Sequence, residues 1–162
     1  GIVEGYDSGY PGCYDEYYYR GTLLSCIYLP EIEPLAEATG RFLLPLYQDR
    51  ALPSTDDFQA YCTKVSMFTR CYDMRTTMCR LLSEEDYLVW MALFDKAVPL
   101  RTLSSKRTWN AVYCQPAYVN DPACYGGVSM FVPMEEYEPY GWNKEFQKTS
   151  WYAAMGWPET GW

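Results

Sequence analysis

The apolar positions between residues 54 and 98 form the longest uninterrupted helical pattern in the chain. Ser54 or Thr55 can cap the first turn, and neither glycine nor proline interrupts the pattern before Pro99. In its first part the polar residues share only about a third of the helix circumference, whereas an ordinary surface helix buries an apolar arc of about 100°. The pattern therefore predicts a central helix over about 55–82 that is covered on two sides.

A second helical pattern begins at Ser83. This residue is a favourable N-cap, Asp86 takes the position of the acidic partner in a capping box, and apolar residues follow at helical spacing until Pro99. Because proline cannot continue a helix, the pattern ends there. We expect two helices hinged at Ser83, with one kinked helix over 55–98 as the alternative.

Other segments predict shorter helices. A helix over 31–49 has proline in its first turn, where proline is tolerated. The apolar run of 21–29 is too short to separate a buried helix from a strand, and we favour a helix because its neighbours are helical. A serine-capped helix is predicted from about 104 to 115, and Asn143 is predicted to cap a last short helix over about 144–155.

The two ends of the chain are rich in aromatic residues but lack sustained helical periodicity. Tyrosine recurs every four positions near the start, yet glycine and proline interrupt this segment. The sequence therefore predicts a mainly α fold, a small helical bundle around the central helix with long irregular arms. The predicted divisions are an extended tyrosine-rich arm at 1–20, a helical core domain at 21–114 and an irregular aromatic-rich arm at 115–162.

No histidine occurs among the 162 residues. This excludes serine–histidine and cysteine–histidine catalysis within the chain, as well as histidine-ligated zinc, iron and haem. Acidic pairs fall at predicted helix N-termini, where the helix dipole explains them. Tyr140 and Lys144 match a dehydrogenase pair, but the glycine-rich turn that such an enzyme needs is missing. We therefore predict a protein that is not an enzyme, with no catalytic residue, metal or cofactor.

A formal net charge of −8 argues against nucleic acid and anionic lipid surfaces as partners. The longest clean apolar run is less than half of the about 20 residues that a membrane-spanning helix needs. We therefore expect no transmembrane span. The expected partners are other protein subunits of a complex, and the protein is expected to lie at most at the periphery of a membrane.

The seven cysteines form no C-x-x-C pair, which argues against a zinc site or redox motif. Two or three disulfides in an oxidising compartment are the first hypothesis, and buried reduced thiols are the alternative. An odd number leaves at least one thiol free or bonded to another chain. The candidates for disulfides are Cys13, Cys26, Cys62, Cys71, Cys79, Cys114 and Cys124.

Aromatic residues of the arms and a stripe on the central helix are candidates for an interface. Tyrosine and tryptophan suit surfaces that are apolar on one side and hydrated at the tip. Methionine adapts to irregular partners, although core packing explains a methionine stripe as well. The candidate interface residues are Tyr6, Tyr10, Tyr14, Tyr18, Lys64, Met67, Met74, Arg75, Met78, Trp142, Trp151, Trp157 and Trp162.

These features together favour a non-catalytic accessory subunit of a large organellar, membrane-associated assembly. An extrinsic photosystem subunit in the thylakoid lumen is the most concrete form of this hypothesis. The chain begins with glycine, not methionine, which suits a processed and translocated protein. A secreted, disulfide-stabilised binding or surface protein is the alternative. An enzyme that uses carboxylates or tyrosine is a third hypothesis that no motif favours.

Overall fold

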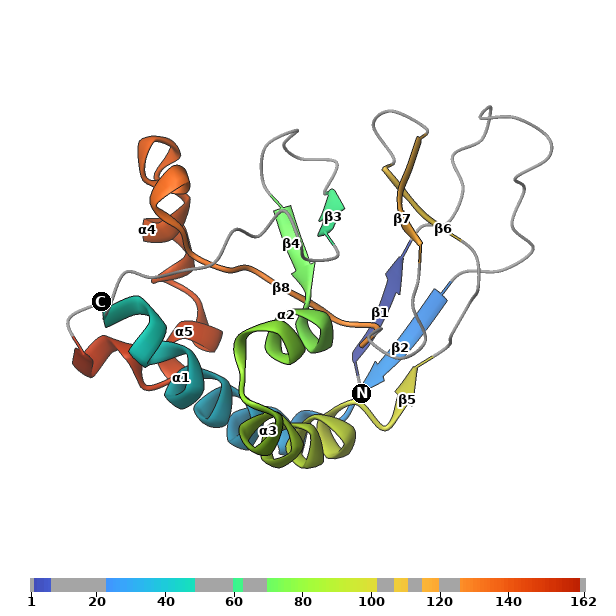
Figure 1. Cartoon of the computed structure of the whole chain (residues 1–162), viewed down its shortest axis with the longest axis horizontal. Helices are drawn as coiled ribbons and strands as arrows, with labels where there is room; N and C mark the ends of the chain where they lie inside the picture. Colours follow the sequence, from blue (N-terminus) through green and yellow to red (C-terminus); the bar gives the residue numbers. More distant parts are fainter. Residues whose placement is uncertain are drawn as a thin grey trace.

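Helices and short antiparallel strands alternate along the chain in the computed structural model (Figure 1). The structure describes residues 2–6, 23–48, 60–62, 70–101, 107–110, 115–119 and 126–160. Within these residues the strands form three small sheets, and two longer helices lie side by side below them in the view of Figure 1.

The first sheet has three antiparallel strands in the order β1-β2-β5. Strand β1 spans Ile2–Tyr6, β2 spans Leu23–Ile27 and β5 spans Leu100–Arg101. In the register of β2 and β5, Cys26 lies opposite Leu100. The middle strand β2 continues almost directly into a helix, so the sheet and the helical layer share one connection.

The second sheet joins segments that are far apart in sequence. Its antiparallel strands are β3 (Ala60–Cys62), β4 (Arg70–Asp73) and β8 (Ser129–Met130), in that order. A separate antiparallel hairpin consists of β6 (Arg107–Asn110) and β7 (Gln115–Val119). Because β4 pairs with β8, the position of β4 depends on a segment that follows much later in the chain.

Two long helices and several short ones complete the fold. In chain order they are the 3₁₀ helix η2 (Leu29–Glu31), α1 (Ile32–Gln48), α2 (Met74–Leu81), α3 (Glu84–Ala97), the 3₁₀ helix η4 (Glu135–Tyr140), α4 (Trp142–Phe146), α5 (Ser150–Ala154) and the 3₁₀ helix η5 (Trp157–Thr160). Helices α4 and α5 lie toward the C-terminal end of α1 in Figure 1. Helix α1 confirms the helix predicted over 31–49 and continues through Pro45.

The N-cap predicted at Ser83 is confirmed. Its hydroxyl oxygen accepts a hydrogen bond from the Asp86 N–H at 3.2 Å, and the hydroxyl donates to Asp86 Oδ2 at 2.9 Å. Helix α2 ends at Leu81, and Leu82 has an extended backbone, so the two helices are separate. This confirms the predicted break at Ser83 but not the length of the helix before it, since a backbone that leaves the helical region before a new cap starts a new helix.

The core lies between α1, α3 and the C-terminal helices. Trp90 is fully buried, and its Nε1–H donates to the Thr39 hydroxyl at 2.9 Å, which joins α3 to α1. Trp157 is fully buried against Tyr47, which lies in the last turn of α1, with ring centroids 4.6 Å apart. Its Nε1–H donates to the carbonyl of Gly40 at 3.0 Å. These two tryptophans fix the middle of α1, because each combines a large apolar area with one satisfied polar group.

The central helix predicted over 55–82 is wrong. Residues 60–62 and 70–73 are strands, and only Met74–Leu81 forms a helix in the described part of this stretch. Apolar positions of a short segment can fit a helical and a strand period equally well. Pairing of β4 with β8 decides between them, and this pairing is not visible in the local pattern.

Three further helix predictions need correction. The run of 21–29 contains strand β2, and the helix predicted over 104–115 is replaced by β6 and the start of β7. The helix predicted over 144–155 is two short helices, because Thr149 caps the second one through the Tyr152 N–H at 3.1 Å. The mainly α bundle is therefore wrong, and the fold mixes helices with β-sheet. The predicted domain boundaries stay a prediction.

Asn143 does not cap a helix as predicted but lies inside α4. Its side chain is buried, accepts from the Met134 N–H at 3.2 Å and donates to the Met134 carbonyl at 2.7 Å. The same amide donates to Glu138 Oε1 at 2.7 Å. Gly156 follows α5 with a φ of 72°, in agreement with its predicted role as a helix stop.

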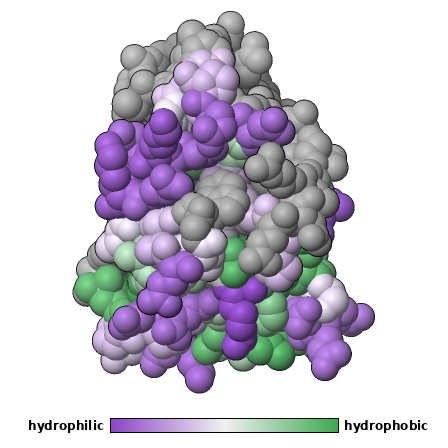
Figure 2. Space-filling model, turned by 90° about the vertical axis from the view of Figure 1, so that its left-hand side faces the viewer, coloured by the Kyte–Doolittle hydropathy of each residue, from purple (hydrophilic) through white to green (hydrophobic). Residues whose placement is uncertain are grey.

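The surface at the left of Figure 1 is mainly hydrophilic, with hydrophobic residues gathered toward its lower edge (Figure 2). Among the described residues, no helix is both long and apolar enough to cross a membrane.

Candidate functional site

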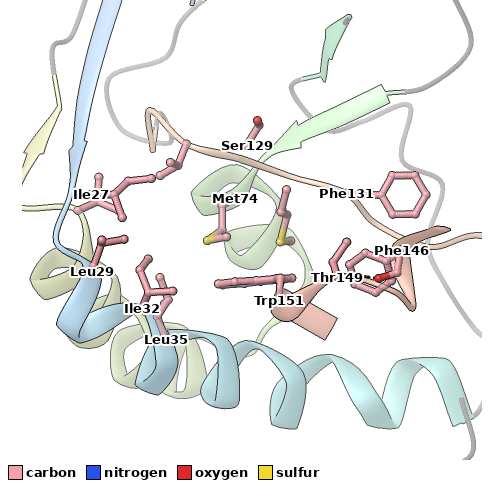
Figure 3. A pocket seen from close by; sticks show the side chains of 13 residues that line it. Ile27, Leu29, Ile32, Leu35, Met74, Ser129, Phe131, Phe146, Thr149 and Trp151 are labelled. Carbon is pink, nitrogen blue, oxygen red and sulfur yellow. Dashed lines mark hydrogen bonds between the residues drawn. The ribbon is translucent and has the colours of Figure 1, made fainter. Parts of the chain in front are cut away.

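An open apolar cavity of about 390 Å³ lies where β2 passes into α1 (Figure 3). The β2–α1 connection forms one wall, the segment around β8 forms another, and the C-terminal helices form a third. The lining residues are Ile27, Leu29, Ile32, Leu35, Met74, Val98, Val128, Ser129, Met130, Phe131, Phe146, Thr149 and Trp151. The cavity is therefore built from segments that are spread over most of the chain.

The cavity is deep at one end and exposed at the other. Leu35 and Val98 are each 1% exposed, whereas Leu29 is 52% exposed. Ile32 and Trp151 are half-buried and pack against the core. The mouth consequently presents apolar side chains to the surroundings.

Polar groups contribute little to the cavity. Among the residues that the structure describes, no acidic or basic side chain lines it, and Ser129 and Thr149 are its polar side chains. The Thr149 hydroxyl already donates to the Phe146 carbonyl at 2.7 Å and accepts from the Tyr152 N–H at 3.1 Å. The described lining therefore suits apolar groups.

A buried carboxylate organises the turn behind the cavity. Asp73 is 0% exposed, and its Oδ1 accepts from the Thr76 N–H at 2.8 Å. Its Oδ2 accepts from the N–H groups of Gly126 at 2.9 Å and Gly127 at 3.1 Å. Burial raises the pKa of this carboxyl, and the hydrogen bonds from Thr76, Gly126 and Gly127 oppose the rise. Asp73 thereby ties the start of α2 to the turn that enters the cavity wall at Val128.

The two glycines of this turn are required by close contacts. Gly127 has a φ of 78°, and a Cβ at this position would collide with the Ser25 hydroxyl. A Cβ on Gly126 would lie 2.6 Å from the Cβ of Arg75. The Ser25 oxygen is buried and makes no hydrogen bond to the part of the chain that the structure describes. Sequence reasoning missed this site, although an aspartate three residues before Thr76 is a readable capping signal.

The two cysteines whose side chains the structure describes are not joined by a disulfide. Cys26 is half-buried in β2, Cys79 is exposed on α2, and both thiols are free. This contradicts the expectation of disulfides at these two positions. The backbones of Cys62 and Cys71 lie in β3 and β4, but their side chains are outside the described part, as are Cys13, Cys114 and Cys124. Since the chain has no histidine, it holds no cysteine–histidine pair of its own.

The structure also shows no group of three or more acidic or cysteine side chains placed to hold a metal ion, within the residues it describes.

The predicted interface residues fall into different places. Met74, Met78 and Trp157 are buried in the core, at 6%, 0% and 0% exposure. Arg75 is half-buried, and its Nε–H donates to the Tyr87 hydroxyl at 3.0 Å. Trp142 and Trp151 are also half-buried. The positions outside the described side chains are Tyr6, Tyr10, Tyr14, Tyr18, Lys64, Met67 and Trp162. An interface role for this set stays a prediction, and burial places the first three in core packing.

Three solved structures are similar to this chain. The inactive zymogen of a C11 protease from Parabacteroides distasonis shares 21% identity over 88% of this chain and 40% of that one, with a TM-score of 0.68. A B. fragilis cysteine protease shares 24% identity over 97% of this chain and 61% of its own, with a TM-score of 0.68. A secreted C11 cysteine protease from Bacteroides thetaiotaomicron, in complex with an irreversible peptide inhibitor, shares 18% identity. The match covers 95% of this chain and 40% of that one, with a TM-score of 0.62. This chain has the α/β fold of these proteases.

The similarity is one of fold and covers part of each neighbour. The chain spans 40% of the first and third structures and 61% of the second. No protein-family model matches the sequence, and no curated protein sequence matches it.

These matches contradict the hypothesis of a non-catalytic photosystem subunit, and equally its alternative, a disulfide-stabilised binding protein. The chain shares its fold with cysteine proteases, and this similarity corrects the predictions of a mainly α fold and of a protein that is not an enzyme. The prediction failed because the absence of histidine was taken to exclude an enzyme. It excludes only a histidine-dependent site that is complete within these residues.

Proposed function

We propose that this chain forms part of a cysteine protease and builds a section of its framework. The observation that carries the proposal is the fold similarity to a B. fragilis cysteine protease, which extends over 97% of this chain at a TM-score of 0.68. Nearly all of this chain therefore has a counterpart within a larger protease. Support also comes from the two C11 proteases, whose likeness covers 88% and 95% of the chain.

The catalytic chemistry in this proposal depends on groups outside these 162 residues. A cysteine nucleophile acts as the thiolate, and a neighbouring base, most often histidine, activates it. The chain has no histidine. Polypeptide beyond this chain would supply the base, and the present residues would hold the scaffold in place around it.

The test uses the native protein, captured from its host with an antibody against this chain. We expect the preparation to hydrolyse a panel of fluorogenic peptides, and we expect iodoacetamide to abolish the activity because it alkylates the thiolate. The matched control is the 162-residue chain alone, which should not hydrolyse the panel because it lacks a histidine. A native preparation without thiol-dependent peptidase activity would contradict the proposal, and so would full activity of the chain alone.

The compartment stays a prediction from the sequence. We propose that the protein is processed and translocated, and support comes from one structural neighbour that is a secreted protease. Pulse labelling with fractionation of the host culture tests this, since protein that remains entirely inside the cell would contradict it.

A further inference from the structure

The cavity beside the β2–α1 connection has an apolar mouth that the described residues leave uncovered. Leu29 at the mouth is 52% exposed, and its neighbour Tyr28 is also 52% exposed. Figure 3 shows Leu29 and Ile32 on one side of the space and Trp151 and Phe131 across it. Contiguous exposed apolar side chains around a hollow are typical of an interaction site, because removing their surface from water is favourable.

The chemistry of the lining favours side chains of a polypeptide over a small ligand. A volume of about 390 Å³ falls in the ordinary range of ligand sites, but such sites hold a few polar groups that orient the ligand. Here no charged residue lines the cavity in the part of the chain that the structure describes, and the Thr149 hydroxyl is already hydrogen bonded to Phe146 at the end of α4 and to Tyr152 in α5. The centre of a protein–protein interface has this character, with charged residues depleted.

The protease neighbours indicate where such a polypeptide comes from. Most of this chain is matched in each of them, but 97% of this chain accounts for only 61% of the B. fragilis protease. A large part of that fold therefore has no counterpart among these residues. We propose that the cavity receives apolar side chains of the polypeptide that completes the protease fold, an inference that rests on the proposed function.

The geometry gives the docking site a rigid rear wall. Val128 lines the cavity, and its carbonyl accepts from the Met74 N–H at 2.8 Å. The Asp73 carboxylate holds the preceding Gly126 and Gly127 through their N–H groups. The wall is thus fixed before any partner arrives, and a preformed site costs little ordering on binding.

Two matched substitutions test the inference in the native protein. Leu29→Asp places a charge at the mouth, whereas Leu88→Asp makes the same change on α3, away from the cavity, at a residue that is 62% exposed. Because both side chains are exposed in the chain alone, neither variant should change its melting temperature. In the native protein, Leu29→Asp should lower Tm by about 4 °C or more, and Leu88→Asp should leave it unchanged. Equal effects of the two variants, or no effect of either, would overturn the inference.

Photo-crosslinking identifies the occupant independently of stability. A benzoylphenylalanine at position 29 of the native protein should crosslink to a peptide of the completing polypeptide, and one at position 88 should not. Crosslinking to a second copy of this chain, to a small molecule or to nothing would overturn the inference. Peptidase activity is measured on the same samples. If activity is present without the expected crosslink, the docking site is wrong and the proposed function stands; if activity is absent, the proposed function itself has failed.

Discussion

The carboxylate of Asp73 is hydrogen bonded to the N–H of Gly127 at 3.1 Å, across 54 positions of the sequence. The same side chain caps α2 through the Thr76 N–H at 2.8 Å. One buried residue therefore connects a helix start with the turn that leads into β8. This connection explains why a short strand and a short helix hold a fixed position beside the cavity, since neither would be stable alone.

Removing this carboxylate should destabilise the fold. Asp73→Ala leaves the buried N–H groups of Gly126 and Gly127 without an acceptor and removes the cap of α2, at an expected cost of about 3 kcal/mol. Urea unfolding followed by circular dichroism measures this cost. The matched control is Asp95→Ala, which removes an exposed ion pair with Arg101 and should cost less than about 1 kcal/mol. Similar losses of unfolding free energy in the two variants would show that the hydrogen bonds of Asp73 do not stabilise the fold more than an exposed ion pair does.

Stability should depend on pH through Asp73 with a definite sign. Burial raises the pKa of this carboxyl above its ordinary value of 3.8, so the folded chain keeps a proton that the unfolded chain has released. The contribution of the protonated Asp73 carboxyl to the free energy of unfolding is fully present below the ordinary pKa. It is lost as the pH rises through the pKa of the folded state. The Tm of the wild type minus that of Asp73→Asn should therefore shrink as pH rises from about 4. If this difference in Tm grows with pH instead, the hydrogen bonds from the N–H groups lower the pKa of Asp73 by more than burial raises it.

Alanine at Gly127 should be far more costly than alanine at another glycine with positive φ. Gly127 and Gly141 have φ of 78° and 71°, but only the first would place its Cβ against a neighbour, the Ser25 hydroxyl. Gly141→Ala should cost about 1 kcal/mol for the backbone alone. Gly127→Ala should cost about 1–3 kcal/mol more through the collision. Chemical denaturation measures the free energy of unfolding of both variants. Equal losses would show that a Cβ at position 127 does not collide with the Ser25 hydroxyl.

The indole N–H of Trp157 should contribute measurably to stability. Trp157→Phe keeps an aromatic ring in the core but removes the hydrogen bond from the indole to the Gly40 carbonyl, at an expected cost of about 1–3 kcal/mol, part of it from lost packing. Trp142→Phe is the control, because Trp142 is half-buried and stacks on exposed Tyr140. It should cost less than half as much. Thermal unfolding of the two variants decides, and a larger loss at Trp142 would contradict the assignment.

Helices with local start and stop signals could be predicted from the sequence. Ser83 caps α3 as expected, and the helix over 31–49 is present as Ile32–Gln48. These helices are stabilised by contacts between residues within a few positions of one another, so the local sequence pattern is enough to predict them. The strands could not be predicted in the same way, because Arg70–Asp73 is a strand through its pairing with Ser129–Met130.

The candidate site could not be predicted at all, because its parts meet only in three dimensions. Ile27, Met74 and Trp151 line one cavity although they are far apart in the sequence. The sequence by itself determined the absence of histidine, the Ser83 cap of α3 and the apolar character of the segments. Only the tertiary structure decided which segments became strands and which apolar side chains stayed exposed at a cavity mouth. Strand pairing and burial are contacts between distant residues, and no local periodicity records them.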